Sequence, residues 1–557
     1  MHHMYCYQCE QTSQGTGCTT LGVCGKDPNT TKLQDVMVHI CKGIAQYAHR
    51  SRELGGSLPE ADRTSLEALF MTLTNVNFDE GEHVSYINGK MSSTLEKLRE
   101  YYHSLCQSKG QVPEFESASR ETPAGFSPFE TEEELLAFAE TVGVEARHKE
   151  MDPDIASLQE LLTYGVKGLA AYAHHALLLG YEEEAVYAFV HEAFDYMTRE
   201  DQTVDKLLEY CLRAGEINLK VMEMLDRAHT ESFGHPEPTE VALTPTKGKA
   251  ILVSGHDLKA TYELLKQTAD KGINVYTHGE LLPANAYPEF KKFPHLVGNY
   301  GTAWQNQQTE FARFPGSILL TTNCLKPPED SYKNRLFTMD VVGHEGCTKL
   351  VGYDFTPLID AALKEPGFDE TAPKKTSTIG FAHNAVLGAA EKVVGLVKAG
   401  KIKHFFLIGG CDGAEFARNY YTDFADKSPD DTVILTLGCG KFRVNQLEFG
   451  DIDGIPRLLD LGQCNDSYSA IKIATALADA FEVEVNDLPL SLIISWFEQK
   501  AVAVLLTLLY LGLKDIRLGP TLPAFLSPNV LKILVDNYNI QPAIDPKKDL
   551  EEILQPA

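Results

Sequence analysis

One segment of this chain occurs twice. Residues 33–55 align without gaps on residues 158–180, and ten of the 23 aligned pairs are identical. In these segments the apolar residues recur three and four positions apart, the spacing that gives a helix one buried face. A repeat of this length predicts a duplicated helical unit, so we expect two related helix bundles in the first 235 residues.

The repeat also preserves polar and aromatic residues. The identical pairs include Tyr47 with Tyr172 and His49 with His174, besides a Lys-Gly pair at 42–43 and 167–168. Residues that recur on a helix face serve packing more often than catalysis. We therefore predict a packing role for these two tyrosines and two histidines.

The pattern of the chain changes after Pro245. Residues 250–254 read as a buried strand, 258–271 as a helix and 272–276 as the next strand, a β-α-β unit that predicts a parallel sheet. Further short apolar runs, separated by helical stretches, lie at 317–321, 404–408, 433–437, 457–461 and 490–495. We predict a helical domain over residues 1–235, a first parallel α/β domain over 236–380 and a second over 381–557.

The N-terminus carries a run of four cysteines with the spacing C-x2-C-x8-C-x5-C, formed by Cys6, Cys9, Cys18 and Cys24. The segment is rich in Gly, Thr and Gln and too irregular to bury a core, so the thiols need a common ligand. A 4Fe-4S cluster requires four thiolates, and such a loop can direct backbone N–H groups at the sulfur atoms. The alternative is a structural zinc site, which more often pairs two C-x2-C units. The spacing favours iron and sulfur over zinc.

A second group of residues is dispersed along the chain. A possible metal ligand follows each predicted strand: His256, Glu280, Cys324, Cys411, Cys439, Cys464 and Glu498. The carboxyl ends of parallel strands face one crevice, where ligands bind. Any one of these residues alone is more simply explained as a buried structural side chain. Seven coincidences of position favour one site shared by both α/β domains.

Glycine directly precedes four of these residues, His256, Glu280, Cys411 and Cys439, and lets the backbone approach a cofactor. Thiolates select iron–sulfur chemistry, whereas carboxylates and imidazole suit a harder, more open iron. A site with both characters indicates a reductase of a small N–O substrate. The remaining cysteines lack this context. Cys347 is the one expected close to the second site, and Cys41, Cys106 and Cys211 are expected in helical cores.

The composition limits the partners of the protein. A formal net charge of −28 argues against nucleic acid and anionic membranes. Twelve cysteines in 557 residues are too dilute for a disulfide scaffold. The longest apolar run, residues 501–513, is too short to span a membrane, which takes about 20 residues. We expect a cytoplasmic monomer. We also expect its electrons to come from a separate protein, because no nucleotide-binding G-x-G-x-x-G motif follows a first strand.

Along essentially its whole length the chain resembles the hybrid cluster proteins, also called prismane proteins or hydroxylamine reductases. The specific segments are residues 6–24, 254–257, 277–284, 322–324, 409–412, 438–441, 462–465 and 496–500. The resemblance implies an N-terminal helical domain followed by two Rossmann-like parallel α/β domains. It implies a 4Fe-4S cluster on the N-terminal cysteines and a hybrid iron–sulfur–oxygen cluster, of the 4Fe-2S-2O type, on the seven strand-end residues. In this family the thiol that matches Cys411 can carry an extra sulfur as a persulfide.

The function implied is reduction of hydroxylamine to ammonia and water, with His256, Glu280 and Glu498 as catalytic residues that open the site or relay protons. Reduction of nitric oxide to nitrous oxide, in defence against nitrosative stress, is the close alternative. A non-catalytic nitric oxide sensor that nitrosylates thiols of other proteins would use the same cluster. A nickel–iron carbon monoxide dehydrogenase is less compatible with the two glutamates. Lys500 follows Glu498 by two residues. It is either a proton donor near the cluster or a solvated surface lysine.

Overall fold

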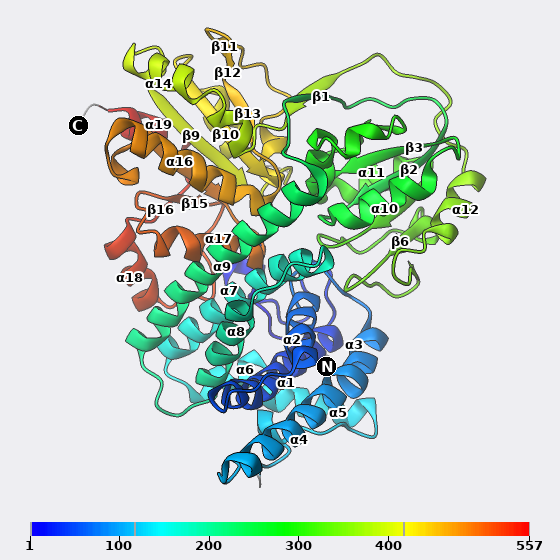
Figure 1. Ribbon diagram of the computed structural model, residues 1–557, viewed down its shortest axis with the longest axis vertical. Helices are drawn as coiled ribbons and strands as arrows, with labels where there is room; N and C mark the ends of the chain where they lie inside the picture. The colour runs from blue at the N-terminus through cyan, green and yellow to red at the C-terminus, as the bar shows by residue number, and fades with distance from the viewer. Residues whose placement is uncertain (1–2, 116–117, 416–417, 556–557) are drawn as a thin grey trace.

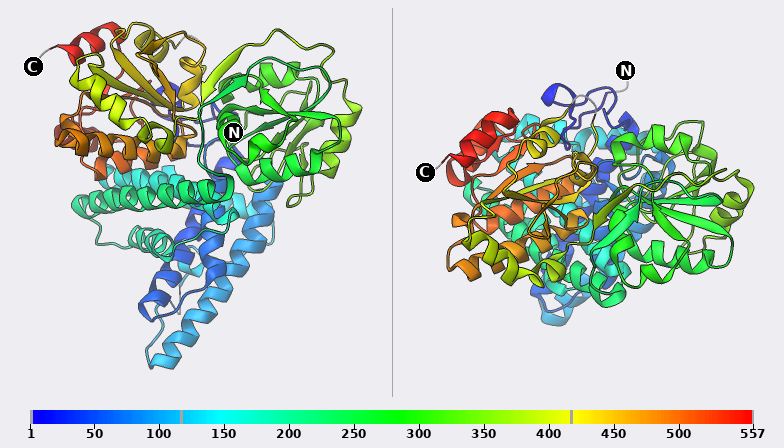
Figure 2. Two further views of the ribbon diagram at one scale, coloured as in Figure 1. Left: turned by 45° about the horizontal axis from the view of Figure 1, so that its top comes forward. Right: turned by 90° about the horizontal axis from the view of Figure 1, so that it is seen from above.

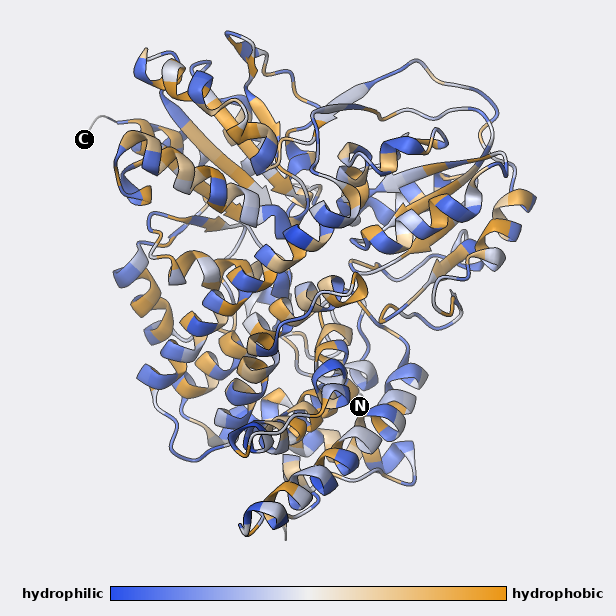
Figure 3. Ribbon diagram, in the orientation of Figure 1, coloured by the Kyte–Doolittle hydropathy of each residue, from blue (hydrophilic) through white to orange (hydrophobic). Residues whose placement is uncertain are grey.

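The computed structural model describes residues 3–115, 118–415 and 418–555. A helical N-terminal region is followed by two six-stranded parallel sheets flanked by helices, which confirms the predicted fold class. The two α/β regions lie side by side above the helical region, and the N-terminal loop passes between them (Figures 1 and 2). Apolar residues concentrate in the strands, and hydrophilic residues cover the outward faces of the helices (Figure 3).

The two copies of the repeat form two largely buried helices of 26 residues each in the N-terminal region, α1 (Pro28–Glu53) and α7 (Pro153–Leu178). Each begins with proline and is capped by an aspartate, Asp27 or Asp152, whose carboxylate accepts backbone N–H groups of the first turn. The second helix of each unit, α2 (Pro59–Met71) and α8 (Glu184–Tyr196), packs across the duplication: α1 contacts α8, and α7 contacts α2. The two repeat units therefore interlock around one apolar core.

The other helices of this region complete the core around the interlocked repeats. The longest, α9, runs from Val204 to Phe233 and packs along α7. The remaining ones are α3 (Glu80–Tyr86), α4 (Ser92–Lys109), α5 (Glu132–Val142) and α6 (Val144–Glu150). Among the described residues, no helix combines the length and the apolar character needed to cross a membrane.

The first sheet has the strand order β4-β3-β2-β5-β6-β7, and every neighbouring pair is parallel. Its strands are β2 (Lys249–Ser254), β3 (Ile273–His278), β4 (Leu296–Asn299), β5 (Ser317–Leu320), β6 (Leu336–Thr338) and β7 (Thr348–Lys349). The accompanying helices are α10 (Leu258–Thr268), α11 (Gln307–Arg313) and α12 (Thr356–Lys364). Strands β2 and β5 are apolar along nearly their whole length because both faces of the sheet are covered.

The second sheet has the order β13-β10-β9-β14-β15-β16 and is also parallel throughout. Its strands are β9 (His404–Gly410), β10 (Thr432–Gly438), β13 (Leu458–Asp460), β14 (Leu490–Ser495), β15 (Arg517–Gly519) and β16 (Gln541–Pro542). Its helices are α13 (His383–Leu387), α14 (Ala390–Lys398), α15 (Tyr420–Asp426), α16 (Ser467–Phe481), α17 (Gln499–Tyr510), α18 (Pro528–Tyr538) and α19 (Pro546–Leu554).

Two short antiparallel pairs lie outside the two large sheets. Strand β1 (Thr239–Ala242) pairs antiparallel with β8 (Thr376–Ile379) and forms a separate ribbon near the predicted boundary at residue 380. A short hairpin, β11 (Asp451–Ile452) with β12 (Ile455–Pro456), stands apart from both sheets.

Helix α17 contains most of the apolar run at 501–513, and it packs against both α7 and α9. Burial on several sides explains why this helix is apolar nearly all round.

Candidate functional site

The strand ends of each sheet are in register. Ser254, the last residue of β2, pairs with His278 of β3 and Leu320 of β5, and Gly410 of β9 pairs with Gly438 of β10 and Ser495 of β14. The residues that follow these strands therefore emerge at one edge of each sheet. One cavity between the two edges is lined by all seven predicted strand-end side chains: His256, Glu280, Cys324, Cys411, Cys439, Cys464 and Glu498.

Two glycines show why the backbone can turn so sharply into this cavity. Gly255 and Gly410 have φ angles of +111° and +114°, a conformation that side-chain-bearing residues rarely adopt. A Cβ atom at Gly410 would collide with the Ser495 carbonyl oxygen, and one at Gly255 would collide with the Thr321 hydroxyl. Glycine at both positions is thus a geometric requirement for presenting the next side chain, His256 or Cys411, to the cavity.

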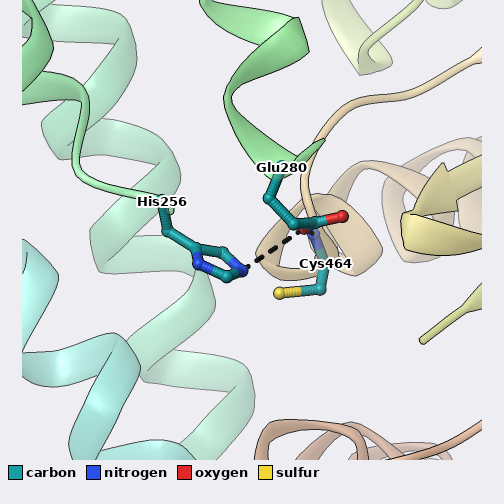
Figure 4. A group of neighbouring side chains, drawn as sticks. All are labelled: His256, Glu280 and Cys464. Carbon is teal, nitrogen blue, oxygen red and sulfur yellow. Dashed lines mark hydrogen bonds and ion pairs between the residues drawn. The ribbon is translucent and has the colours of Figure 1, made fainter. Parts of the chain in front are cut away.

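Three of the seven side chains already lie at ligand distance from one another. The metal-binding atoms of His256, Glu280 and Cys464 all lie within 4.8 Å of one another, although they come from both sheets (Figure 4). Nε2 of His256 is 3.5 Å from Oε2 of Glu280, and the Cys464 backbone N–H donates to the same oxygen at 2.8 Å. The other oxygen, Oε1 of Glu280, is buried without a hydrogen-bond partner among the described residues. An orphaned carboxylate oxygen in such a place fits a metal ion.

The electrostatics of the cavity favour metal-binding protonation states at the oxygen and nitrogen donors. Burial opposes ionisation of Glu280, but His256, Lys441 and the Cys464 N–H outweigh it and lower the pKa of the carboxyl to about 2. Burial and the nearby Lys500 ammonium lower the pKa of His256. At neutral pH the site therefore presents a carboxylate and a neutral imidazole, the forms that bind metals.

The thiols need a cation to become ligands. Burial raises the pKa of Cys324, Cys411, Cys439 and Cys464, and the Glu280 carboxylate raises it further in each case. Without a metal these thiols would stay protonated at neutral pH. A bound metal centre supplies the positive charge that deprotonates them. The donor set, four sulfurs with carboxylate oxygens and one imidazole, fits an iron–sulfur site that also has oxygen and nitrogen ligands.

Lys500 belongs to this site. Its side chain is about 1% exposed, so the alternative of a solvated surface lysine is wrong. Its Nζ lies 3.2 Å from Nε2 of His256 and 3.6 Å from Oε1 of Glu498, and it donates to Oδ1 of Asn323 at 2.9 Å. Lys500 lies in the first turn of α17, directly after β14. That position in a parallel α/β sheet is the sequence signal that could have placed it in the crevice.

Two polar residues that the sequence did not single out connect the sheets. Nε2 of Gln463 donates to the backbone carbonyls of His256 at 3.0 Å and Glu280 at 2.8 Å. Nδ2 of Asn323 approaches Oε1 of Glu498 at 3.4 Å. These side chains fix the position of one strand-end loop relative to its counterpart across the cavity.

The four N-terminal cysteines are also neighbours. Cys6 and Cys18 exchange backbone hydrogen bonds, and the Ser13 N–H points at the Cys18 sulfur at 3.5 Å. Burial raises the pKa of Cys9, and the three other thiols, Cys24 first, raise it further. Clustered thiols with a backbone N–H aimed at sulfur fit an iron–sulfur cluster.

The loop with the N-terminal cysteines reaches the strand-end site. Cys9 belongs to the same small apolar cluster as Trp304, Cys439 and Phe497, and Cys324 and Cys411 pack against that cluster. The backbone N–H of Glu10 donates to the Phe497 carbonyl at 3.0 Å. The two groups of cysteines are thus adjacent in space, although they are far apart in the sequence.

The other cysteines are located elsewhere. Cys41, Cys106 and Cys211 are buried in helices α1, α4 and α9, as expected. Cys347 does not line the cavity: it sits directly before β7, where burial raises its pKa to about 11 while Lys333 lowers it and Asp79 raises it. The expectation that Cys347 lies close to the second site is therefore wrong, because β7 is the edge strand of the first sheet, two strands away from β5 and the Cys324 that follows it.

Comparison with known proteins identifies the family. The model of the prismane/CO dehydrogenase family matches residues 4–551. The chain belongs to this family. It is 53% identical over 556 residues to a hydroxylamine reductase from Thermodesulfovibrio yellowstonii, covering 99% of this chain and all of the relative. It is 52% identical over 558 residues to a hydroxylamine reductase from Acidiphilium cryptum, covering 99% of each chain.

Solved structures with a similar fold are carbon monoxide dehydrogenases. The enzyme from Thermococcus sp. AM4 aligns with a TM-score of 0.55 and 18% identity, covering 98% of this chain and 90% of the other. Carbon monoxide dehydrogenase IV from Carboxydothermus hydrogenoformans gives a TM-score of 0.53 with 14% identity, covering 98% and 92%. At this identity the likeness shows that this chain and these enzymes share a fold. It says nothing about the substrate of this protein.

Proposed function

We propose that this protein is an iron–sulfur oxidoreductase that reduces hydroxylamine to ammonia and water. The observation that carries the proposal is the convergence of four thiols, two carboxylates and one imidazole from both sheets on one cavity. The relatives that are 52–53% identical over the whole chain and are named hydroxylamine reductase support it. The seven side chains would hold a hybrid iron–sulfur–oxygen cluster, with Cys411 as a thiol or persulfide, and Cys6, Cys9, Cys18 and Cys24 would hold a 4Fe-4S cluster.

When bound, the hybrid cluster supplies an open iron for the N–O substrate and delivers electrons to it. The reaction takes up two electrons and two protons and breaks the N–O bond, so the leaving oxygen gains negative charge before it is protonated. Burial disfavours the Lys500 ammonium, but Glu498, whose Oε1 lies 3.6 Å from Nζ, outweighs burial and raises its pKa. Lys500 therefore stays cationic at neutral pH and stabilises that charge.

Hydrogen bonds hold His256 and Glu498 in position at the site. The Thr322 hydroxyl lies 3.0 Å from Nδ1 of His256 and fixes the ring so that Nε2 faces Glu280 and Lys500. Glu498 caps α17 by accepting the Lys500 backbone N–H at 2.8 Å. His256, Glu280 and Glu498 would hold the metal through nitrogen and oxygen, and each could carry a proton to the substrate, which sulfur ligands do less readily.

Electrons are proposed to enter at the N-terminal loop from a separate donor protein. Leu21 and Val23, which shortly precede Cys24 in the sequence, are 59% and 57% exposed. The apolar cluster around Cys9 continues from this loop to Cys439 and Phe497. The loop thus offers a short connection from the surface to the strand-end site.

The test is anaerobic turnover with reduced methyl viologen as the electron donor. We expect about eight irons per chain in two spectroscopically distinct clusters, and one ammonia formed for each two electrons consumed. The same assay with nitric oxide in place of hydroxylamine tests the alternative substrate. Zinc in place of iron, or no ammonia from hydroxylamine, would contradict the proposal.

A further inference from the structure

The equivalent tyrosines of the two repeat copies differ in their hydrogen bonding. Tyr47 and Tyr172 occupy equivalent positions on α1 and α7, and both are fully buried. The Tyr47 hydroxyl donates to the Ala124 carbonyl at 3.2 Å. The Tyr172 hydroxyl has no hydrogen-bond partner among the described residues. A buried hydroxyl without a partner costs free energy, so packing alone does not explain the second tyrosine.

Tyr172 lies at the inner end of an apolar cavity that reaches the surface. The cavity encloses about 1060 Å³ of empty space, part of it open to solvent, and its wall is mostly aliphatic side chains of β9, β14, α16 and α17. Exposed Asn486, Lys514 and Asp515 lie at its outer end, and Tyr172, Cys411 and Cys464 lie at its inner end. A small uncharged molecule that follows this cavity inward therefore meets the Tyr172 hydroxyl beside two predicted cluster ligands.

The hydroxyl remains a proton donor in this place. A tyrosine hydroxyl keeps its proton at neutral pH, because its ordinary pKa is about 10. The Lys500 ammonium lies 5.9 Å from the centre of the tyrosine ring. Cys464 lines the same cavity, and the Tyr172 hydroxyl makes no hydrogen bond to it or to any other described residue. The O–H group is thus available to a ligand in the cavity.

We propose that the Tyr172 hydroxyl donates a hydrogen bond to the oxygen of the N–O substrate bound beside Cys411 and Cys464. This assignment rests on the proposed function. The hydroxyl keeps its proton, and the hydrogen bond holds the substrate oxygen with similar strength before and during N–O cleavage, so its loss should appear in KM. Tyr172 acts here as a substrate-binding residue, while the packing role predicted for the repeated tyrosines applies to Tyr47.

The experiment compares Tyr172→Phe with Tyr47→Phe, which removes the same hydroxyl at the equivalent position of the first repeat. Both variants are loaded with clusters anaerobically and assayed for ammonia formation from hydroxylamine. We expect Tyr172→Phe to raise KM for hydroxylamine and to lower kcat/KM by about tenfold, the effect of one missing hydrogen bond. Its iron content and cluster paramagnetic resonance spectrum should match the wild type. Tyr47→Phe should leave KM and kcat unchanged.

A second measurement is independent of turnover. Hydroxylamine is titrated into the loaded proteins without an electron donor, and the dissociation constant is read from the change in the cluster spectrum. Tyr172→Phe should bind about tenfold more weakly than the wild type. Equal affinities would overturn the inference. A loss of iron or a shifted spectrum in Tyr172→Phe would also overturn it, because either result would show that the hydroxyl donates to the Cys464 sulfur instead. A wild-type protein that binds hydroxylamine but forms no ammonia would contradict the proposed function alone.

Discussion

The indole ring of Trp304 stacks on the phenyl ring of Phe497, with ring centroids 4.2 Å apart and an angle of 30° between the planes. Both residues are buried, and Phe497 directly precedes the predicted ligand Glu498. Cys9 of the N-terminal loop and Cys439 of the second sheet pack in the same cluster. The stack therefore attaches the N-terminal cysteine loop to the strand-end site.

Removing the indole ring should destabilise this junction. Trp304→Ala leaves a large void in a buried cluster and is expected to lower the free energy of unfolding by about 3–5 kcal/mol. Urea unfolding followed by circular dichroism measures the loss. Leu21→Ala, on the exposed part of the N-terminal loop, is the control and should change stability by less than about 0.5 kcal/mol. An equally small effect of Trp304→Ala would show that the stack does not support the junction.

A buried ion pair directly behind the site makes a second prediction. Nζ of Lys441 donates to Oδ1 of Asp460 at 2.7 Å, and both side chains are essentially inaccessible. Lys441→Met would leave the Asp460 carboxylate buried without a cation and should cost about 3–5 kcal/mol. Combining it with Asp460→Asn should recover much of that loss, because a neutral amide needs no cation. Strictly additive losses in urea unfolding would contradict this account.

The pair of His174 with Asp340 predicts a pH dependence of stability. Nε2 of His174 lies 2.6 Å from Oδ2 of Asp340. Burial disfavours the charged ring, but Asp340 outweighs burial and raises the pKa of His174 above 6.5. Burial likewise opposes the Asp340 carboxylate, yet His174 outweighs it and lowers the Asp340 pKa below 3.8.

The sign of the effect follows from these two shifts. The histidine contribution is complete below pH 6.5 and disappears as the pH rises through the raised folded-state pKa. The aspartate contribution is complete above pH 3.8 and disappears as the pH falls through the lowered pKa. His174→Gln should therefore cost most near pH 5, about 1.5–3 kcal/mol, and progressively less above neutral pH. The control His49→Gln, at the equivalent repeat position, loses a 3.8 Å contact to the exposed Glu53 and should cost less than about 1 kcal/mol at pH 5.

The two proposed clusters should be separable by mutation. Glu280→Ala removes an oxygen donor from the strand-end cavity, so we expect loss of the hybrid-cluster spectrum and about half of the iron. The N-terminal cluster should remain, because its cysteines lie on their own loop. Cys9→Ser should give the reciprocal result. Retention of the full hybrid-cluster spectrum and full turnover in Glu280→Ala would exclude this glutamate as a ligand.

The sequence predicted the elements that carry the site because they obey local rules. The apolar runs at 250–254 and 490–495 became strands β2 and β14, since buried parallel strands must be apolar on both faces. The repeat predicted α1 and α7 from helical spacing alone. The short edge strands β7 and β16 were missed, because two residues at a sheet edge leave no periodic pattern.

The sequence by itself determined which side chains stand at strand ends, because strand ends and the glycines beside them are local features. It did not determine the partners of those side chains. Tertiary structure decided that Lys500 is buried against His256 and that Gln463 bridges two loops. It also decided that the Tyr172 hydroxyl, unlike that of Tyr47, has no hydrogen-bond partner in the described part of the chain. These contacts join residues up to hundreds of positions apart, and only the packing of the two sheets on the helical region brings them together.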